Sequence, residues 1–249
     1  MEQTLEFTID GLPVTAAPGE TIMAAADAAG IYIPRLCAMK GLSPFGACRL
    51  CTVLVDGRSQ SACTQPAAAG MVVENDTEQL QGFRKNLIDM LFVEGNHFCM
   101  ACEKSGNCEL QALAYRFGIL APKYQYQFPQ REIDASHPDV LLDRNRCILC
   151  ARCVRASQEL DGKEIAGFVG RGGEKHLAAS SGCGFVGTDV AADDAALAAC
   201  PVGALLRKRV GFSTPIGQRK YDHQPIGCEK ELRPEKSSTT SDVQKGVAS

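Results

Sequence analysis

The order of apolar and polar positions gives the N-terminal part of the chain the pattern of a small sheet. Residues 4–9 alternate, so that Leu5, Phe7 and Ile9 share one face, as in a half-buried strand. The Asp-Gly pair that follows is a hairpin turn signal. We therefore predict an N-terminal hairpin whose return strand includes residues 14–16.

One helix and further strands complete this region. The alanine-rich residues 20–29 place apolar side chains on one side, and Gly30 is suited to end a helix there. Apolar runs at residues 52–55 and 71–73 predict strands. Strands around one helix predict a small α+β domain that ends near residue 76.

The clearest helix signal follows this domain. Apolar side chains recur at spacings of three and four residues, at Leu80, Phe83, Leu87, Met90 and Leu91. Asp76 or Thr77 can cap the start of this helix, which should end before Gly95. The simplest interpretation of the apolar stripe is packing against a core.

The rest of the chain predicts short helices joined by irregular segments. We expect these helices at residues 109–117, at residues 151–160, and after Asp193 or Asp194 up to Cys200. Residues 119–138 and the glycine-rich residues 162–187 are typical of loops. Beyond about residue 228, Lys, Glu, Ser and Thr dominate, which predicts a disordered or partner-bound tail.

Composition narrows the possible functions. The chain has 249 residues, 13 of them Cys, and a formal net charge of −3. The negative charge disfavours nucleic acid as a partner. The sequence predicts neither a secretory signal nor a membrane span, so we expect a cytoplasmic protein with reduced thiols. An odd number of Cys also argues against a closed disulfide framework, which leaves metal ligation as the expected role.

The first group of thiols predicts a [2Fe–2S] cluster. Its members are Cys37, Cys48, Cys51 and Cys63. Two pairs of thiols supply the two ligands that each iron needs. The small residues Gly46 and Ala47 would let backbone N–H groups approach the cluster sulfurs. One zinc ion held by four thiolates is the alternative at this spacing.

The middle group predicts a [4Fe–4S] cluster with an unusual ligand. Its members are His97, Cys99, Cys102 and Cys108, which include every Cys between residues 64 and 146. A His in a loop is more often structural than a ligand, but here three thiols lack a fourth partner. Zinc held by three thiolates and one imidazole is the alternative.

The third group predicts a second [4Fe–4S] cluster. Cys147, Cys150 and Cys153 follow a C-x2-C-x2-C spacing that reaches three corners of a cubane, and Cys200 in a Cys-Pro step supplies the fourth ligand. Zinc fits less well, because zinc ribbons use separated pairs. Cys183 and Cys228 are expected to be free thiols, with Cys183 as an alternative to Cys200.

Together these motifs resemble a known family. The order of the three sites is similar to the N-terminal part of the large iron–sulfur subunit of respiratory NADH dehydrogenase. It resembles more closely the small iron–sulfur subunit of the diaphorase module of NAD-reducing [NiFe] hydrogenase, because His97 precedes Cys99 by two positions and not by four. The resemblance rests on residues 95–99, 102–111, 147–150, 200–205, 208–211 and 215–221.

The resemblance implies a fold and a division into domains. We expect an α+β chain that starts with a [2Fe–2S] ferredoxin-like (β-grasp) domain at residues 1–76. A helical segment with the His/Cys cluster would follow at residues 77–137, and a [4Fe–4S] ferredoxin-like domain at residues 138–212. Residues 213–249 would form a partly disordered C-terminal extension.

The resemblance also implies a function as an electron relay without catalytic residues. Electrons would pass between FMN and NAD(H) on a flavoprotein subunit and the Ni–Fe centre of the hydrogenase small and large subunits. One [2Fe–2S] and two [4Fe–4S] clusters would carry them, within a hydrogen:NAD+ oxidoreductase. The same module in an NAD-dependent formate dehydrogenase or an electron-bifurcating hydrogenase is an alternative. A zinc-organised scaffold is the alternative from a different class.

Overall fold

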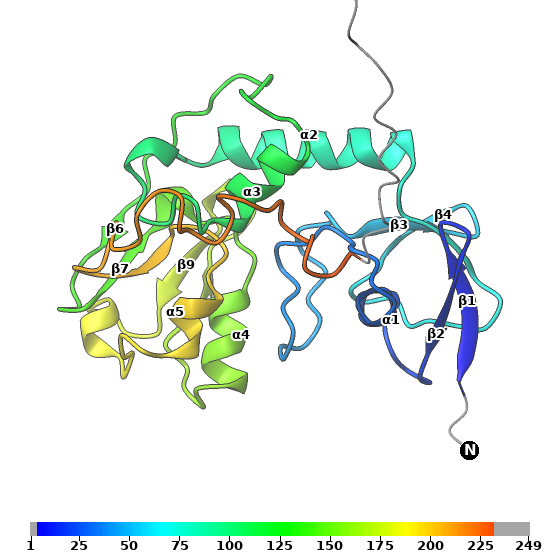
Figure 1. The fold of residues 1–249 in the computed structure, drawn as a ribbon. Coiled ribbons are helices and arrows are strands. Elements are labelled where there is room, and N and C mark those ends of the chain that lie inside the picture. Colours follow the sequence, from blue (N-terminus) through cyan, green and yellow to red (C-terminus); the bar gives the residue numbers. More distant parts are fainter. Residues whose placement is uncertain (1–3, 232–249) are drawn as a thin grey trace, which may run out of the picture.

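The chain forms two lobes bridged by one long helix (Figure 1). The computed structural model describes residues 4–231. The first lobe holds a five-stranded sheet and helix α1, and the second holds short helices with two smaller sheets. Helix α2 runs along both lobes, and the C-terminal segment returns from the second lobe to the first, beside α1.

The first lobe has the predicted α+β character. Its elements are β1 (Leu5–Ile9), β2 (Leu12–Ala16), α1 (Ile22–Ala28), β3 (Thr52–Val55), β4 (Arg58–Ser61) and β5 (Val72–Glu74). The strand order is β2-β1-β5-β3-β4, with β1 and β5 parallel and the other pairs antiparallel. The predicted hairpin forms with Leu5 opposite Ala16. Phe7 and Ile9 share the core with residues of α1.

Helix α2 (Glu78–Glu94) starts as predicted but buries a different face. The Thr77 hydroxyl caps it by accepting a hydrogen bond from the Leu80 N–H at 3.2 Å. Phe83 and Met90 are 40% and 44% exposed, so they do not belong to the buried stripe. Arg84 occupies the buried face instead, because it has polar partners in the first lobe. No helix in the described range is both long and apolar enough to cross a membrane.

The second lobe begins with the middle group of candidate ligands. Its first elements are η1 (Cys99–Ala101), α3 (Glu109–Arg116), β6 (Ile133–Asp134), β7 (Val140–Asp143), η2 (Arg144–Arg146) and α4 (Arg152–Glu159). It continues through β8 (Ala166–Val169), η3 (Gly172–Glu174), β9 (His176–Ala179), η4 (Phe185–Gly187), α5 (Ala195–Ala199) and β10 (Leu205–Arg207). Strands β10, β7 and β6 form one antiparallel sheet.

The glycine-rich residues 162–187 are more regular than their composition predicts. Strands β8 and β9 form an antiparallel hairpin, with Phe168 opposite Leu177. Gly170 has a φ of 74°, and a Cβ there would overlap the Glu174 carbonyl. The turn between β8 and β9 therefore requires glycine. This explains why a residue that is usually taken as a loop signal occurs within a hairpin.

Residues 215–231, here called the C-terminal strap, cross from the second lobe to the first. The Tyr221 N–H donates to the Gly106 carbonyl at 3.0 Å. Farther along, Gly227 lies against the Tyr32 ring so closely that a Cβ would overlap it, and Lys230 pairs with Asp27 at 3.0 Å. The chain is thus packed on itself as far as residue 231. The tail predicted beyond that point lies outside the described residues.

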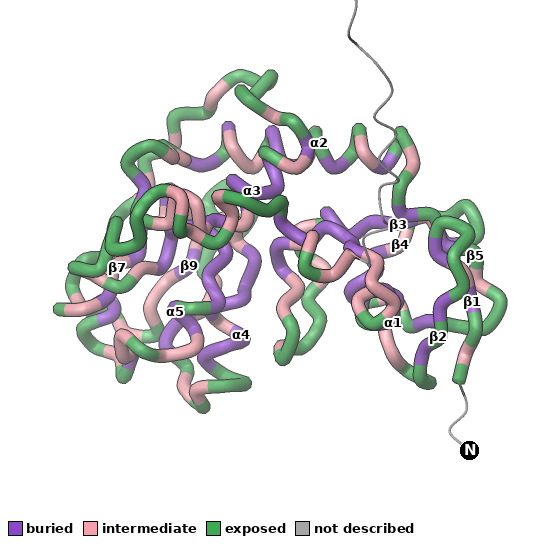
Figure 2. Tube along the Cα trace, viewed as in Figure 1, coloured by how far each residue is buried: buried purple, intermediate pink, exposed green. Residues whose placement is uncertain are grey.

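Buried positions occur in both lobes and, at intervals, along α2 (Figure 2). The core of the second lobe extends into the first, where it includes Tyr32, Leu36 and Leu50. The chain around the first group of thiols is therefore packed from both sides.

Candidate metal centres

The structure brings the first four thiols together in two pairs. The N–H of Cys37 donates to Cys48 Sγ at 3.4 Å, and the N–H of Cys48 donates to Cys37 Sγ at 3.5 Å. The sulfur atoms of Cys51 and Cys63 lie 3.4 Å apart. Cys51 lies just before β3 and Cys63 just after β4, so the β3–β4 hairpin fixes this second pair.

Hydrogen bonding within this group favours the thiolate of one Cys in each pair. Contacts with Cys48 and Cys63 lower the pKa of the Cys37 thiol to about 2, and the contact with Cys63 lowers the pKa of Cys51 to about 7. The same contacts raise the pKa of Cys48 and Cys63. Thiolates are the ligands that metals require. The first group therefore brings four thiols together and favours ionisation of two of them.

The middle group surrounds a small pocket at the end of α2. His97, Cys99, Cys102 and Cys108 all line it. Cys108 caps α3, and its Sγ accepts a hydrogen bond from the Gln111 N–H at 3.5 Å. Helix α3 therefore directs its positive N-terminal end toward this sulfur, which favours the thiolate form.

His97 is held with one ring nitrogen buried and unsatisfied. Its Nε2 atom is inaccessible to solvent and has no hydrogen-bond partner within the described part of the chain. Burial, together with the charge of Arg146, lowers the pKa of His97 to about 4. The ring is therefore neutral at pH 7, as a metal ligand must be. A buried, unpartnered nitrogen fits a site that a metal completes.

Two glycines leave room for this arrangement. A Cβ on Gly95 would overlap His97 Nε2, and a Cβ on Gly203 would lie 2.6 Å from Cys102 Sγ. Arg146 closes the same side of the pocket, with Nη1 at 3.7 Å from Cys102 Sγ and at 3.1 Å from Glu103. The pocket thus has a positively charged wall beside a sulfur ligand.

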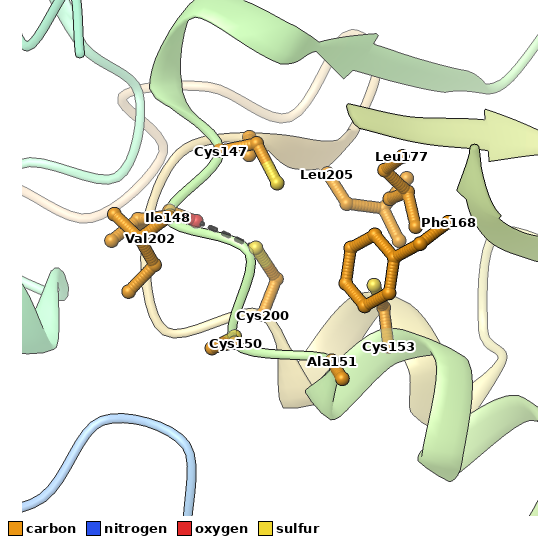
Figure 3. A pocket seen from close by; sticks show the side chains of 11 residues that line it. Cys147, Ile148, Cys150, Ala151, Cys153, Phe168, Leu177, Cys200, Val202 and Leu205 are labelled. Carbon is orange, nitrogen blue, oxygen red and sulfur yellow. Dashed lines mark hydrogen bonds between the residues drawn. The ribbon is translucent and has the colours of Figure 1, made fainter. Parts of the chain in front are cut away.

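The third group lines an apolar pocket between α4, β8 and β10 (Figure 3). Cys147, Cys150, Cys153 and Cys200 all lie on its wall, and the sulfur atoms of Cys147 and Cys200 point into the space. Cys183 is exposed and lies outside this pocket, so the geometry favours Cys200 as the fourth member. Cys228 lies in the strap, half-buried.

Backbone strain shapes the loop that carries the third group. Leu149 and Ala151 lie in the left-handed region with φ of 53° and 58°, which non-glycine residues seldom adopt. The N–H groups of Leu149 and Arg152 donate toward Cys147 and Cys150. The unusual backbone thus turns amide groups toward the sulfurs, as strained loops at functional sites often do.

Burial disfavours the anionic forms of Cys108 in the middle group and of Cys147 and Cys150 in the third group. It raises the pKa of Cys108 and Cys150 to about 12, and that of Cys147 to about 11. Their anionic forms are therefore unfavourable unless a cation compensates them. Within residues 4–231, no three His, Cys, Asp or Glu side chains converge closely enough to hold a single metal ion. The middle and third groups line pockets and do not meet at a point.

Four arginines that were not predicted as site residues lie around the three groups. They are Arg84, Arg146, Arg152 and Arg155, of which all but Arg146 are buried. A signal was present, since Arg146, Arg152 and Arg155 alternate with the Cys of the third group and Arg84 falls on the buried face of α2. Arginine is rarely buried without a defined partner.

Arg152 contacts the neighbourhoods of the other two groups. It forms two hydrogen bonds with the Glu109 carboxylate, at 2.7 and 2.8 Å, next to Cys108. It also donates to the Ala38 carbonyl at 2.8 Å, next to Cys37. Arg152 lies between Cys150 and Cys153 in the sequence. It therefore connects the third group of thiols to the backbone next to Cys37 and to the residue next to Cys108.

Three family models match successive parts of the chain. A 2Fe-2S iron–sulfur cluster binding domain matches residues 2–78. The NADH-ubiquinone oxidoreductase-G iron–sulfur binding region matches residues 84–122, and the ferredoxin-like domain of NADH-quinone oxidoreductase subunit 3 matches residues 137–206. The chain therefore contains 2Fe–2S and 4Fe–4S types of iron–sulfur domain, and the predicted fold class is confirmed.

The most informative relative matches along almost its whole length. The NAD-reducing hydrogenase HoxS subunit gamma of Cupriavidus necator is 38% identical over 224 residues, which cover 90% of this chain and 95% of that protein. The chain belongs to the HoxS gamma family. A crystal structure of an NAD+-reducing [NiFe]-hydrogenase in the H2-reduced state contains a chain that is 50% identical to this one, with a TM-score of 0.87, and the match covers 90% of this chain and 96% of that one.

Larger proteins share the same region with the HoxS gamma family. The NADPH-Fe(3+) oxidoreductase subunit alpha of Geobacter sulfurreducens is 35% identical over 214 residues, which cover 84% of this chain but 24% of that protein. NADH-quinone oxidoreductase subunit 3 of Thermus thermophilus is 29% identical and is covered over 34% of its length. The predicted relation to both the hydrogenase and the respiratory subunits is confirmed.

Proposed function

We propose that this chain is the electron-transfer subunit of the diaphorase module of an NAD-reducing hydrogenase. The observation that carries the proposal is the gathering of twelve candidate ligands into three separate groups within one chain. Similarity to HoxS gamma along nearly its whole length supports the hydrogenase setting. The chain would contribute no catalytic residue and would take part in the oxidoreductase reaction only as a relay.

Each group would hold one cofactor. Cys37, Cys48, Cys51 and Cys63 would bind a [2Fe–2S] cluster. His97, Cys99, Cys102 and Cys108 would bind one [4Fe–4S] cluster, and Cys147, Cys150, Cys153 and Cys200 a second. Such clusters supply one-electron transfer when bound. The residues of this chain would fix their positions, exclude water with apolar walls and set the surrounding charge.

The complete reaction would need other chains. A flavoprotein subunit would bind FMN and NAD(H), and the hydrogenase small and large subunits would hold the Ni–Fe centre. The sequence contains no glycine-rich dinucleotide motif that would place NAD on this chain. Reduced thiols are maintained in the cytoplasm, which is where we place the complex.

Metal analysis of the native complex tests the cofactor assignment. We expect about ten irons on this chain, from one two-iron and two four-iron clusters, with zinc absent. Cluster signals from anaerobically purified complex, recorded by electron paramagnetic resonance, would identify the three sites. Stoichiometric zinc with little iron would contradict the proposal and support a structural scaffold.

Activity assays test the hydrogenase assignment separately. The complex should reduce NAD+ with hydrogen as the electron donor. Reduction with formate and none with hydrogen would place the same iron–sulfur subunit in a formate dehydrogenase. That outcome would reject the hydrogenase while leaving the electron relay intact.

A further inference from the structure

The first group of thiols is enclosed by two buried arginines that come from outside its own lobe. Arg84 comes from α2, which ends near His97, and Arg155 from α4, which carries Cys153. Their exposed fractions are 1% and 6%. Charged side chains are seldom buried to this extent unless an opposite charge compensates them.

Arg84 lies behind the pair formed by Cys51 and Cys63. Its guanidinium donates to the carbonyls of Leu50 and Thr52, at 3.1 and 3.0 Å, which flank Cys51 on both sides. It also donates to the backbone and side-chain oxygens of Asn75, at 2.8 and 2.7 Å. All these partners are neutral, and no carboxylate among residues 4–231 forms an ion pair with Arg84. Burial lowers the pKa of Arg84 to about 10, so it remains a cation at pH 7.

Arg155 lies behind the other pair, Cys37 and Cys48. Its guanidinium donates to the Cys37 carbonyl at 2.5 Å and to the Ser43 carbonyl, and it stacks on the Phe45 ring at 5.3 Å. It too forms no ion pair with a carboxylate in the described structure. One Cys of each pair, Cys51 and Cys37, thus has its backbone in contact with a buried cation, and neither cation forms an ion pair with a carboxylate among residues 4–231.

The ligands of the first site supply the missing negative charge. Four thiolates on a two-iron core of about +2 leave a net charge of about −2, and each added electron makes it more negative. A buried cation stabilises the more negative state, because the low dielectric of the interior screens it weakly. We propose that Arg84 of α2 and Arg155 of α4 act as positioning residues that raise the reduction potential of the first cluster.

This inference rests on the proposed function, because it requires a [2Fe–2S] cluster at the first site. The test uses the full chain in its native complex and a redox titration followed by electron paramagnetic resonance. In Arg84→Gln the reduction potential of the first cluster should fall, while the potentials of the other two stay near those of the wild type. Arg84→Lys keeps the charge and should restore most of the potential.

A matched control separates local charge from net charge. Lys85→Gln removes one cation from the next position of α2, where the side chain is exposed and water screens it. We expect no shift in this variant. Arg155→Gln should reproduce the downward shift of Arg84→Gln from the opposite side of the site.

The outcomes are distinguishable. An unchanged potential in Arg84→Gln and Arg155→Gln, with the cluster retained, would overturn the inference and leave both residues structural. Loss of the first cluster in both variants would also overturn it, because the charge would then serve assembly. A wild-type complex without a [2Fe–2S] signal would reject the proposed cofactor itself and not only the role of the arginines.

Discussion

The first and middle sites are organised in different ways. At the first site the sulfurs already contact one another in pairs, and a hairpin of their own lobe fixes one of these pairs. At the middle site the four side chains surround a pocket, one ring nitrogen has no partner, and two glycines are needed to leave room. The first site therefore has one thiol pair fixed by a hairpin of its own lobe, whereas the middle site depends on the end of α2 and on Arg146 and Gly203, which lie beside the third group of thiols.

The difference shows where each site is vulnerable. Small changes near the first site are absorbed by a continuous sheet and its core. At the middle site Gly203 and Arg146, which flank the third group of thiols, form part of the wall. A disturbance around Arg146 or Gly203 should therefore reach the middle site directly.

Removal of the histidine should give the largest effect. In His97→Ala the middle site loses one of four ligands, so we expect about four of about ten irons to be lost while the [2Fe–2S] signal remains. Iron analysis with electron paramagnetic resonance measures both. His176→Ala, which removes a His from β9, is the control and should keep all the iron. An unaltered middle-cluster signal in His97→Ala would mean that another residue is the fourth ligand.

Crowding of the same ring should have a smaller effect. In Gly95→Ala the new methyl group would overlap His97 Nε2, so the ring must move and most of the iron at the middle site should be lost. Gly82→Ala, within α2, is the control, because a Cβ there meets nothing within 4 Å. There we expect a gain of about 0.5–1 kcal/mol from helix propensity. Equal iron content in both variants would show that the middle site tolerates movement of His97.

Removal of the carboxylate beside Cys108 probes the connection between the sites. Glu109→Gln leaves the buried Arg152 cation without its counter-charge, which typically costs about 3–5 kcal/mol. Amide hydrogen exchange should then accelerate both in α3 and around Ala38, because Arg152 contacts both regions. Glu164→Gln, at an exposed position, should change neither. Faster exchange in α3 alone would show that Arg152 does not connect the first site to the others.

The smallest expected effect concerns the strap. Burial acts to raise the pKa of Asp27, but hydrogen bonds and charges from Arg35 and Lys230 outweigh it and hold the pKa below 3.8. The folded state thus favours the carboxylate, so this contribution to stability is present above pH 3.8 and is lost as the pH falls below it. Asp27→Asn should cost about 0.2–1 kcal/mol per partly exposed pair at pH 7.

Amide exchange in residues 226–230 checks this prediction. Exchange should be faster in Asp27→Asn than in the wild type at pH 7, and the difference should vanish at low pH. Asp193→Asn, which changes an exposed carboxylate of the second lobe, should leave the strap unaffected. A difference that persists at low pH would assign the strap contact to something other than the carboxylate charge.

Local patterns in the sequence predicted more than distant ones. Alternation at residues 4–9, the capping signal at Thr77 and the C-x2-C spacings each involve neighbours in sequence, and the structure contains the corresponding hairpin, helix and groups of thiols. The remote Cys200 was identified by its Cys-Pro step and not by spacing. The β8–β9 hairpin was missed because its turn requires glycine, which composition alone assigns to loops. Arg84 was missed for another reason: its partners Leu50, Thr52 and Asn75 belong to a different lobe.

The strap ties the order of synthesis to the order of folding. Lys230 and Asp27 are 203 positions apart in the chain. At a synthesis rate of ~5–20 residues per second, Asp27 exists for about 10–40 s before Lys230 does. The first lobe can therefore fold while Tyr32 and Asp27 are still uncovered. We expect the contact between Lys230 and Asp27 to form after that lobe is in place.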